Sequence, residues 1–327
     1  MESQPHPYDT LTPELVIDAV ESTGRVSDLR IQPLNSYENR VYQVGIEGEA
    51  PLIAKFYRPE RWTDEQILEE HQFAAELFDA GVPVVPPIAD DNGATLFNYA
   101  GFRVSLYPRF GGRAPQLDDM DSLLVLGRLV GRIHAVGALR PFSHRPTLTV
   151  DSFGTDSYQF IAEHFIPPAL YQSYVSLCED TLAIIRQRIG DHPATAIRVH
   201  GDCHLGNILW RDEVVHFVDL DDSRMAPAIQ DIWMFMSGER ADQTAQLSEL
   251  IDGYNEFHDF RPRELNWVEP LRTLRMMHYS AWLARRWQDP AFTHNFPWFN
   301  TERYWSETIL ELREQFALLN EPPLQLM

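Results

Sequence analysis

The pattern of apolar and polar residues changes character about a third of the way along the chain. The first part contains short runs of β-branched and aromatic residues separated by turn-forming residues, which is the pattern of β-strands. A helical stretch interrupts these runs, and a helix with Thr12 as its cap precedes them. We therefore predict a small antiparallel sheet from residues 29–34, 40–46, 51–57, 95–98 and 102–107.

Beyond this part, the apolar positions recur at helical spacing. Leucine, valine and isoleucine repeat through residues 117–139, and similar patterns follow toward the end of the sequence. Residues 108–113 separate the two parts, because their adjacent glycines are unsuited to regular structure. The sequence therefore predicts an α+β protein with two lobes, residues 1–108 as an N-terminal lobe and residues 109–327 as a mainly helical C-terminal lobe.

Composition limits the classes of partner. The 327 residues are 44% hydrophobic, enough for a large core, and carry a formal net charge of −21. A surface this acidic repels phosphate backbones and anionic lipid, so we expect no nucleic acid and no membrane as partner. Two distant cysteines predict no disulfide framework, and the sequence has neither a secretory leader nor an apolar run approaching ~20 residues. We therefore expect a cytoplasmic protein. We also expect a monomer, although none of these observations bears on the oligomeric state.

Residues 198–222 contain the side chains with the clearest chemical potential. Asp202 ends a His-Gly-Asp triplet, Asn207 follows five residues later, and Asp219 comes after an apolar run. These residue types in this order suit phosphoryl transfer, which needs positioning and charge neutralisation more than reactive protein groups. Asp202 would accept the proton of a substrate hydroxyl, while Asn207 and Asp219 would supply oxygen ligands to Mg²⁺, with Asp219 bridging the cation to the phosphates.

Two strand patterns between Asn207 and Asp219 support this interpretation. Residues 208–210 and 214–218 can form a hairpin that brings the two side chains together. Taken singly, His-Gly-Asp and Asp-Leu-Asp more often mark turns or solvated strand ends, but their combination at this spacing favours a functional site. A zinc site is a weak alternative, because zinc sites usually pair two ligand clusters. Its candidate ligands are His200, Cys203 and His204.

Longer segments resemble a known family. The run from His200 to Asn207, followed by Asp219, is similar to the aminoglycoside phosphotransferase and choline kinase branch of the kinase-like fold. Within that branch, four segments resemble the bacterial stress response kinase A family, the YihE/RdoA proteins. These segments are LNSYENRVY at 34–42, KFYRPERW at 55–62, GDCHLGNILW at 201–210 and NFPW at 295–298. The resemblance covers essentially the whole chain.

The resemblance implies a two-lobed protein-kinase-like fold that uses Mg²⁺ and ATP. It assigns Ser36 to the nucleotide phosphates through its hydroxyl, although the loop 35–39 lacks the glycines that protein kinases have at this position. The alternative, that Ser36 only satisfies a turn, is equally open from the residues alone. The adenine ring is expected against the backbone of residues 106–110.

Lys55 lies in an apolar strand pattern, where a charged side chain is out of place without an anionic partner. The resemblance implies that it contacts the α- and β-phosphates and that a glutamate of the next helix orients it. Either Glu69 or Glu70 could do so, and Glu70 is favoured because it shares a helix face with Phe73 and Leu77. The alternatives are a strand-edge lysine facing water and two solvated glutamates. The buried face of that helix is predicted to contain Ile67, Phe73, Leu77 and Phe78.

Three further residues have mainly structural expectations. Asp231 resembles the kinase aspartate that braces the catalytic loop by hydrogen bonds to its backbone. Asp221 would either lie near the metal ligands or be an exposed carboxylate. His134 is expected to pack or to form a hydrogen bond within the core.

The resemblance, and not the motif, implies that the acceptor hydroxyl belongs to Ser or Thr of a protein, with autophosphorylation and a role in bacterial stress response. We therefore expect a phosphotransferase with an alcohol acceptor, specifically a protein serine/threonine kinase. Two alternatives stay open. One is a small-molecule kinase acting on an aminoglycoside, choline or a related alcohol. The other is an ATP-binding pseudokinase scaffold, which would have no need of a base such as Asp202.

Overall fold

The computed structural model describes residues 6–115, 120–211 and 214–326. The chain divides into two compact units, each assembled from separate segments. The sheet unit consists of Met1–Gln116, Phe142–Arg145 and Asp202–Ser223, and the helical unit consists of Leu117–Pro141, Pro146–Gly201 and Arg224–Met327. The units group residues 202–223 with the sheet, and the lobe division after residue 108 stays a prediction.

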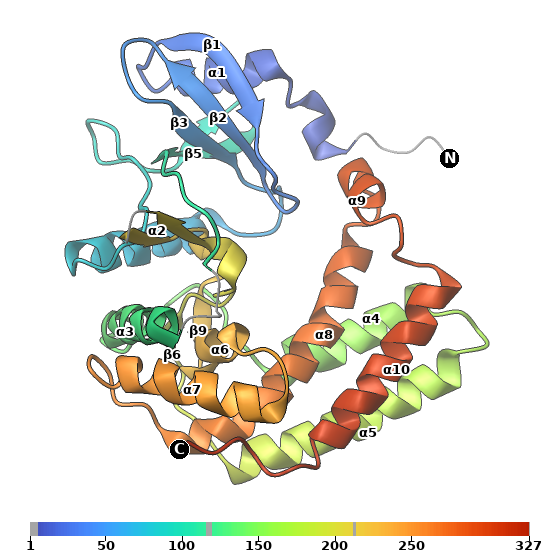
Figure 1. Ribbon diagram of the computed structural model, residues 1–327. Helices are drawn as coiled ribbons and strands as arrows, with labels where there is room; N and C mark the ends of the chain where they lie inside the picture. The colour runs from blue at the N-terminus through green and yellow to red at the C-terminus, as the bar shows by residue number, and fades with distance from the viewer. Residues whose placement is uncertain (1–5, 116–119, 212–213, 327) are drawn as a thin grey trace. The chain divides into compact units, whose positions relative to one another are not determined.

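The sheet unit contains a five-stranded antiparallel sheet in the order β1-β2-β3-β5-β4 (Figure 1). Its strands are β1 (Ser27–Pro33), β2 (Arg40–Ile46), β3 (Leu52–Phe56), β4 (Phe97–Tyr99) and β5 (Phe102–Pro108). These strands confirm the five segments predicted from the sequence. Because β3 is central, Lys55 has Val41 and Ser105 as its cross-strand neighbours.

One face of the sheet is buried beneath the N-terminal helices η1 (Pro7–Thr10) and α1 (Pro13–Glu21). Thr12 caps α1 by accepting a hydrogen bond from the Leu15 amide at 3.3 Å, and Pro13 occupies the first turn, where a missing N–H costs nothing. Side chains alternate along β3, so the buried Ala54 and Phe56 point into this core and Lys55 points to the opposite face.

Helix α2 (Asp64–Asp79) begins at a capping box formed by Thr63 and Gln66. Ile67, Phe73 and Leu77 are buried, as the helical spacing predicts. The expectation for Phe78 is wrong, because this side chain is 57% exposed. One residue beyond Leu77 corresponds to a rotation of about 100°, which carries Phe78 out of the buried stripe.

The predicted hairpin is present in the sheet unit as β7 (Ile208–Arg211) and β8 (Val214–Phe217). A short helical turn, η3 (Leu205–Asn207), precedes it, and a second, η4 (Leu220–Asp222), follows it. The Val218 amide donates to the Asn207 carbonyl at 3.0 Å, which extends the pairing to the open end of the hairpin. The hairpin therefore places residues 207 and 219 at the same end, as predicted.

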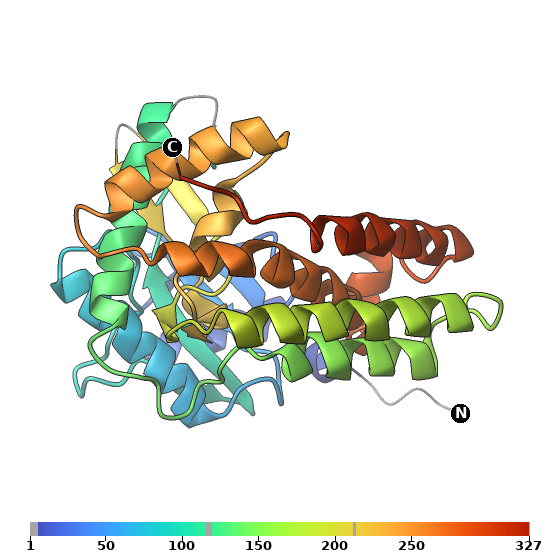
Figure 2. The ribbon, with the colours of Figure 1, turned by 90° about the horizontal axis from the view of Figure 1, so that it is seen from below.

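The helical unit is built mainly from long helices that pack side by side (Figure 2). Its larger helices are α3 (Met120–Gly137), α4 (Asp156–His164), α5 (Tyr171–Asp191), α7 (Arg240–Tyr254), α8 (Val268–Arg285) and α10 (Glu302–Leu318). Its shorter elements are the π-helical turn η2 (Asp151–Thr155), α6 (Ile229–Ile232), η5 (Trp233–Phe235), η6 (Pro262–Trp267), α9 (Pro290–Asn295) and the strand pair β6 (Ile197–Val199) and β9 (Arg224–Ala226).

Two expectations from composition can be compared with the described residues. None of their helices combines the length and the apolar character needed to cross a bilayer. Cys178 and Cys203 are both buried, and no disulfide joins them.

Candidate active site

Lys55 is at the centre of a buried cluster of charges in the sheet unit. It is the only lysine among the 27 lysine and arginine residues of the sequence, and it is 6% exposed. Its Nζ atom lies 3.0 Å from Asp219 Oδ1 and 3.1 Å from Asp221 Oδ1. Burial alone would lower the pKa of Lys55, but these carboxylates outweigh it and raise that pKa well above its ordinary value. The ammonium group is therefore charged, and it is a compact point charge of the kind that binds phosphate.

Asp221 is the most strongly held acid of this cluster. It is 3% exposed, forms ion pairs with Lys55 and Arg61, and accepts a hydrogen bond from Asn39 Nδ2 at 3.2 Å. Burial alone would raise the pKa of Asp221, but the two cations lower it to about 2. Of the two alternatives expected for Asp221, the exposed carboxylate is therefore wrong.

Arg61 and Asn39 are functional candidates that the sequence interpretation missed. Arg61 pairs with Asp221 and, through Nη2 at 2.9 Å, with Asp222. Asn39 accepts a hydrogen bond from the Arg58 amide at 3.0 Å while its Nδ2 donates to Asp221. Both residues lie in segments that carry the family resemblance, and that was the available signal.

The two candidate glutamates of α2 have different surroundings. Glu69 accepts hydrogen bonds from three consecutive backbone amides, at 2.5, 2.9 and 2.8 Å, and so fixes the loop 143–145. Glu70 is 3% exposed, with Arg145 Nη1 4.0 Å from its Oε2. Burial raises the pKa of Glu70 to about 7, and the positive charge of Lys55 partly offsets this. Among the described residues, the ion pairs of Lys55 are those with the two aspartates, so the pairing of Lys55 with Glu70 stays a prediction.

Asp202 and Asn207 are joined by a local hydrogen bond. Asn207 Nδ2 donates to the Asp202 carbonyl at 2.9 Å, which directs the amide oxygen of Asn207 away from this contact. His204 Nδ1 accepts from the Gly206 amide at 2.9 Å, so its ring proton is on Nε2, and this atom lies 3.4 Å from Asp202 Oδ2. His204 therefore helps to orient the carboxylate of Asp202.

Asp219 has a backbone conformation that is uncommon for its residue type. Its φ of 60° and ψ of 63° lie in the left-handed region, which costs a residue other than glycine about 1 kcal/mol or more. The side chain is 52% exposed although it contacts the buried Lys55. This conformation presents one carboxylate both to the lysine and to solvent, where a ligand can reach it.

Asp231 has the bracing role that the sequence predicts. In the helical unit, its Oδ2 accepts from the His200 amide at 2.7 Å and its Oδ1 accepts from the Gly201 amide at 2.9 Å. His134 Nε2 lies 3.0 Å from Asp231 Oδ2, and Nδ1 lies 3.0 Å from the Tyr254 hydroxyl. Both expectations, a structural Asp231 and a core His134, are confirmed.

The expected nucleotide contacts outside the charge cluster stay predictions. The Ser36 hydroxyl donates to the Asn39 carbonyl at 3.1 Å, which is the geometry of a satisfied turn. This contact does not test whether Ser36 binds phosphates. It also does not bear on whether residues 106–110 contact adenine. Leu106 is buried in β5, and Phe110 beyond the strand is 42% exposed.

The side chains present suit a hard cation better than zinc. Within the described ranges, no group of three or more His, Cys, Asp or Glu residues is arranged to hold a metal, so the zinc alternative has no support. The amide oxygen of Asn207 and the carboxylate of Asp219 are oxygen donors at the same end of a hairpin. Mg²⁺ is commonly bound by one or two such side chains together with substrate phosphates, so this donor set fits Mg²⁺.

An antiparallel sheet with a buried, carboxylate-paired lysine, followed by a braced His-Gly-Asp loop, an asparagine and a further aspartate, defines the class of kinase-like phosphotransferases. The model of the phosphotransferase enzyme family matches residues 30–268. The chain is also 44% identical over 320 residues to stress response kinase A of Escherichia coli strain K12, with 98% of this chain and 97% of that protein covered. It therefore belongs to the phosphotransferase enzyme family and, within it, to the stress response kinase A family.

A further relative and two solved structures agree with this assignment. The serine/threonine protein kinase RdoA of Salmonella typhimurium is 44% identical over 319 residues, with 98% of this chain and 97% of that protein covered. An amicoumacin kinase gives a TM-score of 0.72 at 18% identity, with 94% of both chains covered. A microcompartment-associated aminopropanol kinase gives 0.68 at 17% identity, covering 93% of this chain and 95% of that one. The likeness confirms the predicted α+β, kinase-like fold, and the chain is a phosphotransferase of a stress response kinase family.

Proposed function

We propose that this protein transfers the γ-phosphate of ATP, with Mg²⁺, to a serine or threonine hydroxyl of a protein, including its own chain. The observation that supports this most directly is the single lysine, buried and charged, beside Asp219 and Asp221. The relatives named as a stress response kinase and as a serine/threonine protein kinase support the acceptor class and the physiological role. The amicoumacin kinase structure contains AMP-PNP and Ca²⁺, which supports an ATP-type nucleotide and a divalent cation.

In the proposed reaction, Asp202 Oδ2 accepts the proton of the acceptor hydroxyl as its oxygen attacks the γ-phosphorus. A new phosphorus–oxygen bond forms, the bond from the γ-phosphorus to the β–γ bridging oxygen breaks, and ADP leaves. His204 Nε2 orients the carboxylate of Asp202, and the Asn207 side chain holds the backbone of the same residue. The backbone before Asp202 is fixed by Asp231 through two amide hydrogen bonds. These contacts would keep the base in one position, which is the main requirement for phosphoryl transfer.

The charge cluster would hold the nucleotide. We infer that Lys55 contacts the α- and β-phosphates, that Glu70 supports it, and that Ser36 contacts the phosphates through its hydroxyl. Asn207 and Asp219 would hold Mg²⁺, which neutralises charge on the phosphates when bound. We propose residues 1–108 as the nucleotide-binding lobe and residues 109–327 as the catalytic and substrate-binding lobe. We propose a cytoplasmic monomer.

The proposed acceptor class is tested by incubating the protein with γ-labelled ATP and Mg²⁺, alone and with a generic protein acceptor. Acid-stable label on serine or threonine, dependent on Mg²⁺, is the expected result. If ATP is consumed only when choline, an aminoglycoside or an amino alcohol is added, the protein is instead a small-molecule kinase. If nucleotide binds without transfer to any acceptor, the pseudokinase alternative replaces the proposal.

The nucleotide site has a second test because Lys55 is the only lysine in the sequence. An acyl-phosphate derivative of ATP, which acylates amines near the phosphates, should modify Lys55, and excess Mg–ATP should prevent it. The α-amino group serves as an internal control, because its labelling should be unaffected by ATP. Labelling of Lys55 that ATP does not reduce would contradict the proposed contact.

A further inference from the structure

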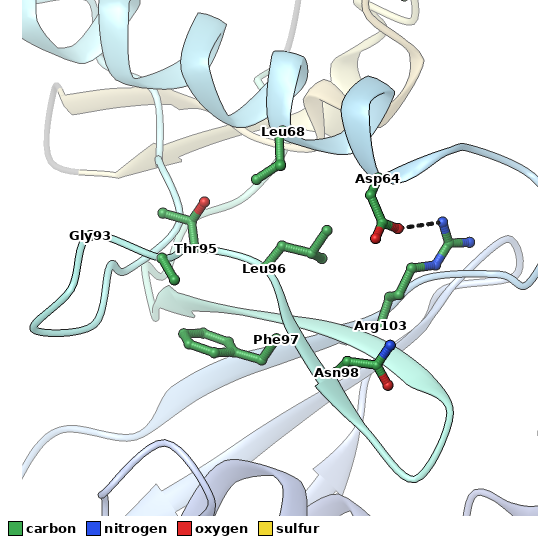
Figure 3. Close-up of a pocket in the computed structure, with 9 residues that line it drawn as sticks. Asp64, Leu68, Gly93, Thr95, Leu96, Phe97, Asn98 and Arg103 are labelled. Atoms are coloured by element: carbon green, nitrogen blue, oxygen red, sulfur yellow. Dashed lines mark hydrogen bonds and ion pairs between the residues drawn. The ribbon is translucent and has the colours of Figure 1, made fainter.

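A half-open cavity of about 330 Å³ lies between α2 and the segment leading into β4 (Figure 3). We call it the α2–β4 groove. Its lining includes Asp64 and Leu68 from α2, residues 95–98 from the opposite wall, and Arg103 from β5. Its volume is at the small end of the range of about 300–1,000 Å³ for ligand pockets. None of these residues belongs to the candidate active site.

The middle of the groove is apolar. Leu68 is 46% exposed and extends from α2 toward the segment that carries Leu96 (Figure 3). Leu96 and Phe97 are themselves only half-buried and line the same open cavity, but Phe97 also packs against the sheet core, so Leu68 and Leu96 are the large apolar side chains available to a ligand. Apolar surface gathered in a concave site is typical of a binding surface rather than of scattered exposed leucines.

The β4 side of the groove offers backbone hydrogen-bonding groups. β4 is the edge strand of the sheet, and among the described strands only β5 pairs with it. Ala100 and Gly101, with φ of 49° and 84°, form a two-residue turn, so Tyr99 and Phe102 are the hydrogen-bonded pair next to the turn. Asn98 is then in a non-hydrogen-bonded pair, and its N–H and C=O point away from β5. Such an edge can add an extended segment as a further strand.

The polar end of the groove contains one ion pair, and its acidic member is the more exposed of the two. Asp64 and Arg103 form an ion pair at 3.2 Å, but the Asp64 side chain is 61% exposed and that of Arg103 only 17%. Arg103 also donates to the carbonyl oxygens of Trp62 and Arg58, so its hydrogen-bonding capacity is largely used within the protein. Asp64 is therefore the charge available to a ligand, on a chain whose net charge is −21. A basic group on a ligand is therefore attracted both by Asp64 and by the net negative charge of the protein.

We propose that the α2–β4 groove docks an extended segment of a partner protein that carries large apolar side chains and a basic residue. The segment's backbone pairs with the outer edge of β4. Its apolar side chains fill the cavity between Leu68 and Leu96, and its basic side chain pairs with Asp64. The apolar contacts supply most of the affinity, and the charge selects basic over acidic segments.

A chain of contacts joins the groove to the candidate active site. The Thr95 hydroxyl lies 2.8 Å from His71 Nδ1, and His71 Nε2 lies 2.8 Å from the Tyr57 hydroxyl. The Tyr57 ring has Lys55 Nζ 5.1 Å from its centroid. A docked segment that orders residues 95–98 is therefore expected to change the affinity for nucleotide. This consequence rests on the proposed use of ATP, whereas docking itself does not.

Docking is tested with the full chain and a fluorescein-labelled peptide, Arg-Thr-Phe-Thr-Leu-Thr-Arg, which presents a basic residue at either end of its apolar face. Fluorescence anisotropy should show saturable binding, and a peptide with glutamate in place of both arginines should bind more weakly. Leu68→Ala should weaken binding about tenfold by removing buried apolar area. Asp64→Asn, which keeps the side-chain shape, should weaken it about threefold.

Matched controls exist elsewhere in the chain. Leu310→Ala removes a leucine that is 56% exposed on α10, and Asp180→Asn removes an exposed charge from α5, so neither should change binding. Thermal melts by circular dichroism establish that every variant is folded. Equal affinity for the basic and acidic peptides, or binding that Leu68→Ala leaves unchanged, would overturn the proposal. So would a dimer that Leu68→Ala dissociates, because a second copy of the chain would then fill the groove.

The same titration repeated with a fluorescent ATP analogue separates the two proposals. Peptide binding together with a changed affinity for the analogue is the expected result. If the analogue fails to bind while the peptide binds, the proposed nucleotide use is wrong and the docking groove stands.

Discussion

At the scale of single residues, buried charges in the sheet unit compensate one another in a specific geometry. Lys55 and Arg61 both form ion pairs with Asp221. Asp219 also forms an ion pair with Lys55, and its side chain remains exposed to solvent. Removing one partner of a buried ion pair costs more than the pair contributes, because the remaining charge is left without compensation. Asp221 is therefore expected to matter for stability as well as for the position of Lys55.

Asp221→Asn tests this balance. The substitution keeps the shape of the side chain but removes the charge opposite two buried cations, and it should lower the free energy of unfolding by about 3 kcal/mol. Asp222→Asn is the matched control, because Asp222 also pairs with Arg61 but its side chain is 31% exposed. Urea unfolding of both variants gives the comparison. A smaller loss for Asp221→Asn than for Asp222→Asn would contradict the assignment.

His71 predicts a pH dependence of stability. His71 is 4% exposed, and burial, followed by the positive charges of Lys55 and Arg145, lowers its pKa to about 3. The unfolded chain binds a proton at His71 below its ordinary pKa of 6.5, and the folded chain does not until the pH approaches 3, so this residue costs stability as the pH falls through that window.

Between about pH 7.5 and about pH 5, wild type should lose about 2 kcal/mol more unfolding free energy than His71→Asn. The comparison with the variant is needed because Glu70, whose pKa is raised by burial, titrates in the same range with the opposite effect on stability. An equal loss in both proteins would show that His71 is not held neutral by the fold.

Local patterns in the sequence were enough to find some site residues but not others. Lys55 is conspicuous as a charge in an apolar strand, and the spacing of Asp202 and Asn207 lies within one short segment. Arg61 and Asn39 contact Asp221 across 160 and 182 positions, respectively. No periodicity relates residues so far apart, so their pairing depends on the tertiary fold and could not be predicted from spacing.

At the scale of elements, close packing of α3 against α7 depends on glycines. A Cβ atom at Gly127 would overlap the carbonyl oxygen of Leu250, and one at Gly253 would overlap that of Leu124. Gly190 in α5 is the contrasting case, because nothing lies within 4 Å of the position its Cβ would take. The two kinds of glycine therefore respond in opposite ways to the same substitution.

Gly127→Ala should destabilise the protein by about 2 kcal/mol, because two packed helices must separate to admit the methyl group. Gly190→Ala should stabilise it by about 0.5 kcal/mol through helix propensity. Thermal or urea unfolding measures both. Destabilisation by both substitutions to the same extent would contradict the packing argument.

Helices and strands with a strong hydrophobic periodicity or a clear capping residue were predictable from the sequence. The limits of their buried faces were less predictable. The capping residue Thr12 marks the start of its helix in the sequence because its side-chain oxygen satisfies an amide that a helix leaves free, and the structure adds Thr63 as the corresponding cap of α2. The prediction of a buried Phe78 is wrong because apolar character alone does not fix the end of a buried stripe. Helical spacing was enough to favour Glu70 over Glu69 as the buried glutamate. The hydrogen bonds of Glu69 could not be predicted in this way, because the loop amides that it binds lie far along the chain.

At the scale of the whole molecule, the family match spans nearly the entire chain, yet the compact units are assembled from separate segments. Residues 142–145 and 202–223 belong with the sheet although long helical segments lie between them in sequence. A pattern read along the chain predicts continuous lobes, because it contains no signal for a segment that returns to an earlier unit. The kinase-like class was predictable, and this interleaving was not.

Binding of Mg–ATP should stabilise the folded chain. At about 100 times the dissociation constant, the gain is about 2.7 kcal/mol, which appears as a raised Tm. Lys55→Ala should strongly reduce this rise in Tm. EDTA should reduce it in the wild-type protein as well, because it removes Mg²⁺. An unchanged Tm for wild type at millimolar Mg–ATP would count against the nucleotide site.

The role of Asp202 as the base is tested by comparing phosphoryl transfer by wild type, Asp202→Asn and Asp180→Asn, with the Mg–ATP Tm shift measured on the same samples. We expect Asp202→Asn to keep the Tm shift but to lose transfer by about 10²–10⁴-fold, while Asp180→Asn behaves as wild type. Transfer by Asp202→Asn at the wild-type rate would contradict the assignment of Asp202 as the base.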